Sequence, residues 1–358
     1  MRVLHCVNES RLAWARPFVQ LLLALRERGA DCTVLCAPGG TLSGFLEKAE
    51  IPCITDKPPF PWFPAACRNV GKVMEEVRPD LIVTRLSSAS LLGGHWGRRL
   101  GIPVVGVLDK FSKRKYYSSA GCVQAVSSAL FAHAISWGAP PAVLIPNCIA
   151  TAEYAPDPQV RARFRASMGI GAGEGVVLGA GRFVEWKGFS VLLGAFRDLM
   201  ERLGNGSPFH LVLAGDGEER GRFERLARDW KMEERIHFTG FVEDIRPLLW
   251  SSDLFVLPSR EPEPFGLVLL EAMASGLPVI ATDCGGPLDM VDPGRNGWLV
   301  PPGDQAALSG VLESSLLGGD LSTVGKAAMA ASARFDTSSV ADATLELYRN
   351  MTERGTPR

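Results

Sequence analysis

The stretch D-L-F-V-L-P-S-R-E-P-E-P-F-G-L-V-L-L-E-A-M-A-S-G-L-P-V-I-A-T-D (253–283) predicts a strand, a turn, a helix and a second strand in succession. The apolar runs at 253–259 and 278–283 have the length and composition of buried strands. The Pro-Phe-Gly turn between them marks the start of a helix. A strand–helix–strand unit of this kind puts two parallel strands in one sheet, so we expect an α/β fold.

Similar apolar runs recur along both halves of the chain. They occur at 2–7, 31–37, 80–84, 103–108, 122–127 and 141–146, and again at 176–182, 209–216, 235–240, 253–259 and 278–283. Continuous apolar strands that alternate with helical patterns predict parallel sheets covered on both faces. We therefore expect two Rossmann-like, doubly wound domains facing a central cleft, with ligands at the carboxyl ends of the strands.

The expected domain boundaries follow from the point at which this rhythm restarts. At 358 residues the chain exceeds the size that one hydrophobic core normally serves. A polar, proline-containing stretch separates the two series of strands. We expect the first domain at 1–147, a linker at 148–158, the second domain at 159–335 and an amphipathic helix within 336–358.

Composition narrows the class of protein. The formal charge of −1, from 38 Lys+Arg and 39 Asp+Glu, argues against nucleic acid as a partner. The eight scattered cysteines favour reduced thiols in a cytoplasmic protein, and Cys32 and Cys36 have no second pair with which to bind zinc. Because no apolar stretch is long enough to span a bilayer, we expect a soluble protein that at most rests on a membrane.

Glu263 and Glu271 bracket the predicted helix start. One carboxylate lies in the loop and the other about a turn and a half into the helix, while the first amides of the helix favour an anion. Carboxylates accept hydrogen bonds from sugar hydroxyls, and amide dipoles favour a phosphate. The arrangement predicts a site for a nucleotide-sugar, although either glutamate alone would more often be a surface or capping residue.

A second motif, G-A-G-R-F-V-E-W-K-G (179–188), follows the first strand of the second domain. Arg182 at the strand tip and Lys187 before the next helix can neutralise a diphosphate leaving group in place of a metal. Solvated cations flanking a turn remain the alternative. Gly215, in A-G-D-G (214–217), permits close backbone approach to a ligand, or serves only a structural turn.

With these motifs the chain resembles the GT-B glycosyltransferases of the retaining family 4 group. The resemblance implies that Arg182 and Lys187 bind the donor diphosphate, that Glu263 lies beside the donor sugar and that Glu271 bonds the ribose. It also implies that the amides around Phe265, Gly266 and Leu267 hold sugar and phosphate. I-P-N-C-I-A (145–150) is similar to the interdomain signature of the family.

The resemblance further implies a terminal helix that returns to the first domain and a metal-independent reaction that retains anomeric configuration. The donor would be a UDP- or GDP-sugar and no cofactor would be required. The acceptor would be a hydroxyl of a growing glycan, of lipopolysaccharide core or another bacterial envelope polysaccharide or glycolipid. From the residues themselves we expect an enzyme of the cytoplasm that can rest on the cytoplasmic face of the inner membrane.

The first domain departs from the family pattern. Its first strand is followed by N-E-S-R-L-A-W-A-R-P (8–17) where the family often has a Gly-Gly turn, and Asp109 stands where the family commonly has a histidine. Asp109 can contact the donor sugar, act on the acceptor hydroxyl or cap a strand end. The runs 57–64 and 109–117 combine aromatic residues with cations and suit a phosphorylated glycolipid or an anionic bilayer, or form an ordinary solvated face.

Two other classes of function remain open at this point. A sugar-nucleotide epimerase or phosphorylase can use the same two-domain frame, and a non-catalytic sugar-nucleotide-binding module can share its donor site. A dinucleotide oxidoreductase is disfavoured because no G-x-G-x-x-G follows the first strand.

Overall fold

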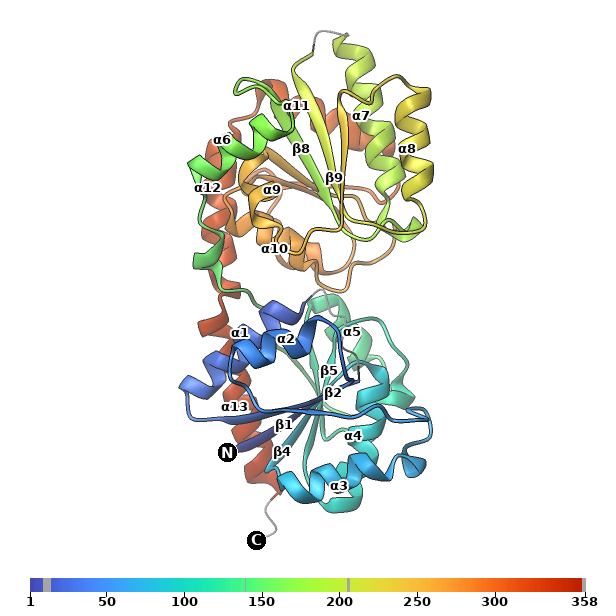
Figure 1. Cartoon of the computed structure of the whole chain (residues 1–358), viewed down its shortest axis with the longest axis vertical. Coiled ribbons are helices and arrows are strands. Elements are labelled where there is room, and N and C mark those ends of the chain that lie inside the picture. Colours follow the sequence, from blue (N-terminus) through green and yellow to red (C-terminus); the bar gives the residue numbers. More distant parts are fainter. Residues whose placement is uncertain (9–13, 139, 205–206, 356–358) are drawn as a thin grey trace. The chain divides into compact units, whose positions relative to one another are not determined.

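The computed structural model describes residues 1–8, 14–138, 140–204 and 207–355. By their contacts they form two compact units. Unit 1 comprises Met1–Ala150 and Arg334–Arg358, and unit 2 comprises Thr151–Ala333. Each unit contains one parallel sheet with flanking helices, which confirms the α/β class (Figure 1).

The sheet of unit 1 has seven strands in the order β3-β2-β1-β4-β5-β6-β7. The strands are β1 (Arg2–Val7), β2 (Asp31–Cys36), β3 (Cys53–Thr55), β4 (Leu81–Arg85), β5 (Val104–Leu108), β6 (Cys122–Ala125) and β7 (Ala142–Leu144). The central strand β1 is buried from its second residue onward. The chain runs from β1 outward to β3 and returns on the other side at β4, so the usual ligand crevice lies at the carboxyl ends of β1 and β4.

The helices of unit 1 include the last helix of the chain. They are α1 (Ala15–Glu27), α2 (Thr41–Lys48), α3 (Arg68–Val77), α4 (Ser87–Leu100), α5 (Ser128–Ile135) and α13 (Thr337–Gly355), with the 3-10 turns η1 (Pro64–Ala66), η2 (Arg114–Tyr116) and η6 (Ala333–Phe335). The helix α13 packs beside α1, and Figure 1 shows the two helices together. Arg28 Nε donates to Asp342 Oδ1 at 2.5 Å, and Tyr348 of α13 is buried against the sheet residue His5.

The sheet of unit 2 has six strands in the order β10-β9-β8-β11-β12-β13. The strands are β8 (Gly175–Ala180), β9 (Phe209–Ala214), β10 (Ile236–Gly240), β11 (Leu254–Leu257), β12 (Val279–Thr282) and β13 (Gly297–Val300). The order again reverses beside the first strand of the unit, which puts the ligand crevice at the carboxyl ends of β8 and β11.

Seven helices of the described residues surround this sheet. They are α6 (Pro158–Ser167), α7 (Phe189–Leu203), α8 (Arg220–Asp229), α9 (Arg246–Ser251), α10 (Leu267–Ala274), α11 (Gln305–Gly318) and α12 (Leu321–Ser332), with the 3-10 turns η3 (Thr151–Tyr154), η4 (Glu185–Lys187) and η5 (Gly286–Asp289). The aspartates Asp157, Asp304 and Asp320 cap α6, α11 and α12 by accepting backbone N–H bonds. The buried aromatic residues of the core are Phe183, Phe189, Phe196, Phe209 and Phe223.

Two edge strands were not predicted. β3 has three residues, C-I-T, and β13 is the short run G-W-L-V, which begins with a glycine. β3 is too short to give a signal, and β13 is four residues long and follows turn-forming residues. They form because a neighbouring strand is already in place to pair with them.

The contacts divide the chain after Ala150 and after Ala333. The first division lies within the expected linker 148–158, and the second lies just before the expected terminal helix. Of the helices that the structure describes, none is both long enough and apolar enough to cross a bilayer.

Candidate functional site

Two loops at the carboxyl ends of the paired strands β8 and β11 pack closely against each other. Gly188 has a φ of +70°, and a Cβ atom there would lie 1.9 Å from Pro258 O, so only glycine fits. Arg260 N donates to Trp186 O at 2.7 Å. These backbone contacts fix the loop that carries Lys187 against the loop that carries Glu263.

Lys187 and Glu263 form a buried ion pair between these loops. Lys187 Nζ lies 2.6 Å from Glu263 Oε2, and Ser259 Oγ donates to the same oxygen at 2.9 Å. The two charged side chains are 13% and 8% exposed. Lys187 Nζ also lies 4.4 Å from the centroid of the Trp186 ring, a cation–π distance. The ammonium is therefore held at the carboxyl edge of the sheet, where an arriving anion would compete with Glu263 for its N–H donors.

The helix α10 begins beside this pair. Gly266, with a φ of +97°, is its N-cap residue, and the half-buried Leu267 is its first residue. Gly286 N donates to Glu263 O at 2.7 Å, and a Cβ atom at Gly286 would lie 2.3 Å from Phe265 O. The loop is thus fixed from two sides, and the first amides of the helix, which have no carbonyl partner within the helix, lie beside the ion pair.

Glu271 is the fifth residue of α10, and a tyrosine orients its carboxylate. Tyr154 Oη donates to Glu271 Oε1 at 2.8 Å. Tyr154 itself is buried, and its carbonyl accepts from Trp250 Nε1 at 3.0 Å. Sequence reasoning placed Tyr154 in the linker and gave it no role. The only sign of its burial in the sequence was a single tyrosine in a polar, proline-containing stretch.

The other two predicted residues of unit 2 lie at strand ends. Arg182 follows β8 and is exposed, and its guanidinium has no ion-pair partner among the described residues. Gly215 follows β9 with a φ of +142°, and a Cβ atom there would lie 1.9 Å from Gly181 O. Backbone packing against Gly181 therefore explains the glycine at 215, and a ligand contact at that position stays a prediction.

In unit 1, Asp109 follows β5 and forms a buried ion pair with Arg85, the last residue of β4. Arg85 Nη1 lies 2.7 Å from Asp109 Oδ1, and the side chains are 7% and 8% exposed. The guanidinium also lies 5.2 Å and 5.3 Å from the ring centroids of Trp14 and Phe18. Burial raises the pKa of the Asp109 carboxyl, and the Arg85 charge opposes that shift. Asp109 Oδ2 has no hydrogen-bond partner among the described residues, so it is available as an acceptor.

Sequence reasoning missed Arg85. The signal was the cation that ends the otherwise apolar strand L-I-V-T-R, at the same sheet edge as Asp109. Arg85 Nη1 also lies 3.5 Å from Oδ1 of Asn147, the asparagine of the 145–150 motif. Arg85, at the end of β4, therefore contacts both Asp109 after β5 and Asn147 of the 145–150 motif.

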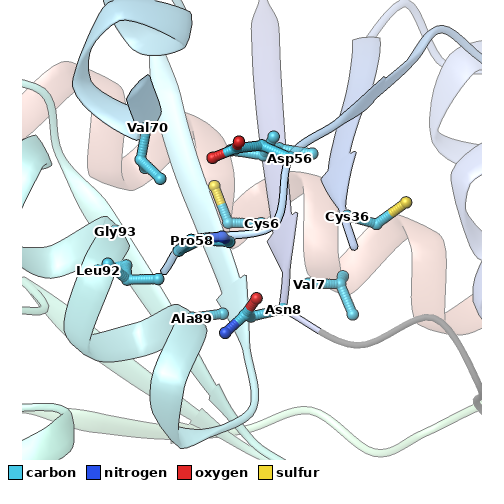
Figure 2. Close-up of a pocket in the computed structure, with 11 residues that line it drawn as sticks. Cys6, Val7, Asn8, Cys36, Asp56, Pro58, Val70, Ala89, Leu92 and Gly93 are labelled. Carbon is cyan, nitrogen blue, oxygen red and sulfur yellow. The ribbon is translucent and has the colours of Figure 1, made fainter. Parts of the chain in front are cut away.

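Unit 1 also has a pocket at the carboxyl ends of β1 and β2 (Figure 2). It is a small, partly open cavity of about 20 Å³, and its wall is mostly apolar. Cys6, Val7 and Asn8 come from β1 and its end, Asp56 from the loop after β3, and Leu92 from α4. Asn8 and Asp56 supply hydrogen-bonding groups. Neither here nor elsewhere in the described part of the chain do three or more His, Cys, Asp or Glu gather as around a metal ion.

Two family models together cover most of the chain. Residues 160–327 match the model described as glycosyl transferases group 1, and residues 16–153 match the model described as glycosyltransferase family 4. The lipopolysaccharide core biosynthesis glycosyltransferase LpsE of Rhizobium meliloti is 29% identical over 316 residues, 86% of each chain. LpsD, with the same description and from the same organism, is 26% identical over 355 residues, which are 97% of this chain and 98% of LpsD.

Solved structures agree with this assignment. The structure of Alr3699/HepE of Anabaena in complex with UDP and glucose superposes with a TM-score of 0.86 at 25% identity. The match covers 98% of this chain and 100% of that one. The chain is therefore an enzyme of the GT-B glycosyltransferases and belongs to family 4, group 1.

Proposed function

We propose that unit 2 binds a UDP-sugar and that the enzyme transfers the sugar with retention of anomeric configuration. The observation that carries this proposal is the group formed by Lys187, Glu263 and the start of α10 at one sheet edge. A cation and the first amides of a helix suit a diphosphate, and carboxylates suit hydroxyls. HepE, which has the same fold, is in complex with UDP and glucose, and this supports UDP over GDP.

Each residue has a proposed role. Lys187 leaves Glu263 and, together with the exposed Arg182, neutralises the diphosphate as it departs. Glu263 then accepts a hydrogen bond from a hydroxyl of the donor sugar, while the amides at Gly266 and Leu267 contact sugar and phosphate. Glu271, oriented by Tyr154, accepts a hydrogen bond from a ribose hydroxyl.

The proposed reaction breaks the bond between the sugar anomeric carbon and the diphosphate oxygen and forms a bond from that carbon to an acceptor oxygen. The acceptor proton passes to the departing diphosphate. Two fixed cations stabilise the negative charge that develops on the diphosphate, so we expect transfer without added divalent metal. A rate in EDTA equal to the rate in Mg²⁺ supports this expectation, and loss of activity in EDTA contradicts it.

Unit 1 is the proposed acceptor side. Asp109 Oδ2 is buried and unpartnered among the described residues, so it suits an acceptor or donor hydroxyl, and the pocket at β1 and β2 offers Asn8 and Asp56. The relatives LpsE and LpsD favour a lipopolysaccharide core, or another envelope glycan, as the acceptor. That acceptor would be met in the cytoplasm.

The first experiment identifies the donor. Thermal stabilisation is measured with UDP-, GDP- and ADP-sugars, since a ligand at 100 times its dissociation constant adds about 2.7 kcal/mol. Lys187→Ala and Glu271→Ala should abolish stabilisation and transfer, whereas Lys326→Ala, an exposed lysine of α12, should change neither. Full activity in Lys187→Ala or Glu271→Ala refutes the donor site.

The second experiment identifies the reaction. The wild type is incubated with the stabilising donor, with and without truncated lipopolysaccharide cores, and the anomeric configuration of the product is read by NMR. Retention with dependence on the acceptor supports the proposal. Inversion refutes it, and epimerised donor formed without acceptor favours the epimerase alternative.

A further inference from the structure

Two loops of unit 1 that are far apart in the sequence lie side by side. The 3-10 turns η1 and η2 both pack on α4. The ring centroids of Trp62 and Tyr116 are 5.2 Å apart, and Lys115 Nζ lies 5.1 Å from the Tyr116 centroid. Residues 57–68 and 110–116 therefore form one continuous surface, here named the aromatic–cationic surface.

The aromatic side chains of this surface are unusually exposed. Phe63 is 70% exposed, Phe60 60% and Trp62 52%. A water-facing surface rarely gathers three large apolar side chains within four residues unless another phase or a partner covers them. The indole N–H of Trp62 and the apolar rings beside it suit the boundary between lipid headgroups and acyl chains.

The backbone that carries these rings has few N–H donors left to hydrate. Pro58, Pro59, Pro61 and Pro64 have no N–H. Inside the loop, the Phe60 carbonyl accepts from Phe63 N at 2.8 Å and from Cys67 Sγ at 3.3 Å, and the Phe63 carbonyl accepts from Ala66 N at 3.0 Å. Moving this tip out of water therefore removes few backbone N–H donors from the solvent.

The same surface is strongly cationic. It contains six Lys or Arg and no Asp or Glu, in a chain whose formal charge is −1. All six are exposed: Lys57, Arg68, Lys110, Lys113, Arg114 and Lys115. A rim of cations around exposed aromatic side chains complements a layer of lipid phosphates.

We propose that the aromatic–cationic surface docks unit 1 on the anionic face of a lipid bilayer. Phe60, Trp62 and Phe63 enter the headgroup region, and the cations contact lipid phosphates. The hydrogen-bonded, proline-rich tip favours a bilayer over a protein partner, because it offers few backbone donors for a partner to recognise. The inference does not depend on the identity of the donor or on the transferase reaction.

The test is co-sedimentation of the full chain with vesicles made of equal parts phosphatidylglycerol and phosphatidylcholine, and with vesicles of phosphatidylcholine alone. Each cation near an anionic surface contributes about a fivefold gain in binding, so K113Q/R114Q/K115Q should bind on the order of a hundredfold more weakly. W62S/F63S should lose on the order of tenfold through its apolar contact. The control R163Q/R225Q/R228Q removes three exposed cations of unit 2 and should bind like the wild type.

Binding that requires phosphatidylglycerol, weakens with salt and is lost in both surface variants supports the proposal. Absence of binding overturns it, as does equal binding to phosphatidylcholine vesicles or equal loss in the unit 2 control. Self-association that W62S/F63S abolishes, without vesicle binding by the wild type, would assign the surface to a second copy of the chain. Circular dichroism and donor-induced thermal stabilisation check that each variant is folded.

Discussion

The buried pair between Lys187 and Glu263 allows a quantitative test that does not require knowledge of the substrate. Lys187→Met removes the ammonium and leaves the 8% exposed Glu263 carboxylate with Ser259 as its remaining side-chain donor. Removing one partner of a buried pair costs about 3 kcal/mol or more. We expect Lys187→Met to lower the free energy of unfolding by about 3 kcal/mol. The loss should not exceed this value by much, because Ser259 still donates a hydrogen bond to the carboxylate.

Glu263→Gln leaves the opposite charge unpaired. The lysine is 13% exposed and lies over Trp186, so its long side chain can extend toward water and keep part of its stabilisation. We expect a loss of about 2 kcal/mol. The double variant leaves no orphaned charge and should lose about 2 kcal/mol in total, which gives a coupling energy of about 3 kcal/mol.

The assay is urea unfolding of the wild type, both single variants and the double variant, followed by tryptophan fluorescence and circular dichroism. Ser322→Ala/Lys326→Met, on an exposed face of α12, is a matched control and should cost less than about 0.5 kcal/mol. A coupling energy below about 0.5 kcal/mol would mean that the two side chains act independently, and it would refute the buried pair. All three pair variants should be inactive in transfer. Lys187→Met and the double variant lack the cation at the diphosphate, and Glu263→Gln lacks the carboxylate proposed to bind the donor sugar.

Three further predictions concern other parts of the structure. Tyr154→Phe removes the 2.8 Å bond to Glu271 and should raise the KM for the donor about fivefold with kcat little changed; an unchanged KM contradicts the positioning role. Gly188→Ala should destabilise by more than about 3 kcal/mol because its Cβ would meet Pro258 O at 1.9 Å, whereas Gly101→Ala, with φ +71° and open space, should cost only about 1–2 kcal/mol in thermal unfolding; equal losses would show that backbone strain alone matters. Burial raises the pKa of Asp109 above 3.8, so the native state binds this proton more tightly than the unfolded chain does, and the stability of the wild type relative to Asp109→Asn should fall as pH rises from about 3.8 to the raised value; urea unfolding across that range checks the sign, and a rising difference contradicts it.

The architecture was predictable because most strands are continuous apolar runs. The central strands of both sheets are buried on both faces, so their sequences carry the signal directly. The edge strands β3 and β13 carry little of it, since pairing with a neighbour rather than apolar length makes them strands. Short edge strands are therefore the part of such a fold that sequence patterns describe least well.

The candidate residues of unit 2 could be predicted because they lie close together in the sequence. Glu263, Gly266 and Glu271 lie within nine residues, and one turn and one helix are enough to relate them. Tyr154 lies 117 residues before its partner Glu271, so no local pattern connects the two. The segment around it is polar and rich in turn-forming residues, which is typical of a linker. Its role depends on η3 packing against α10.

Both units contain a buried cation–carboxylate pair at the carboxyl ends of two central strands. In unit 1, Arg85 ends β4 and Asp109 follows the adjacent strand β5. In unit 2, Lys187 and Glu263 follow the adjacent strands β8 and β11. A lone charge in such a position would pay a large desolvation cost, and a partner across the strand pair reduces it. Each charge is visible in the sequence, but strand order decides which charges meet. Because Arg85 already engages one oxygen of Asp109, this carboxylate can offer a substrate a single acceptor oxygen, whereas Lys187 must exchange Glu263 for the diphosphate. The unit 2 pair should therefore open when donor binds, while the unit 1 pair stays closed.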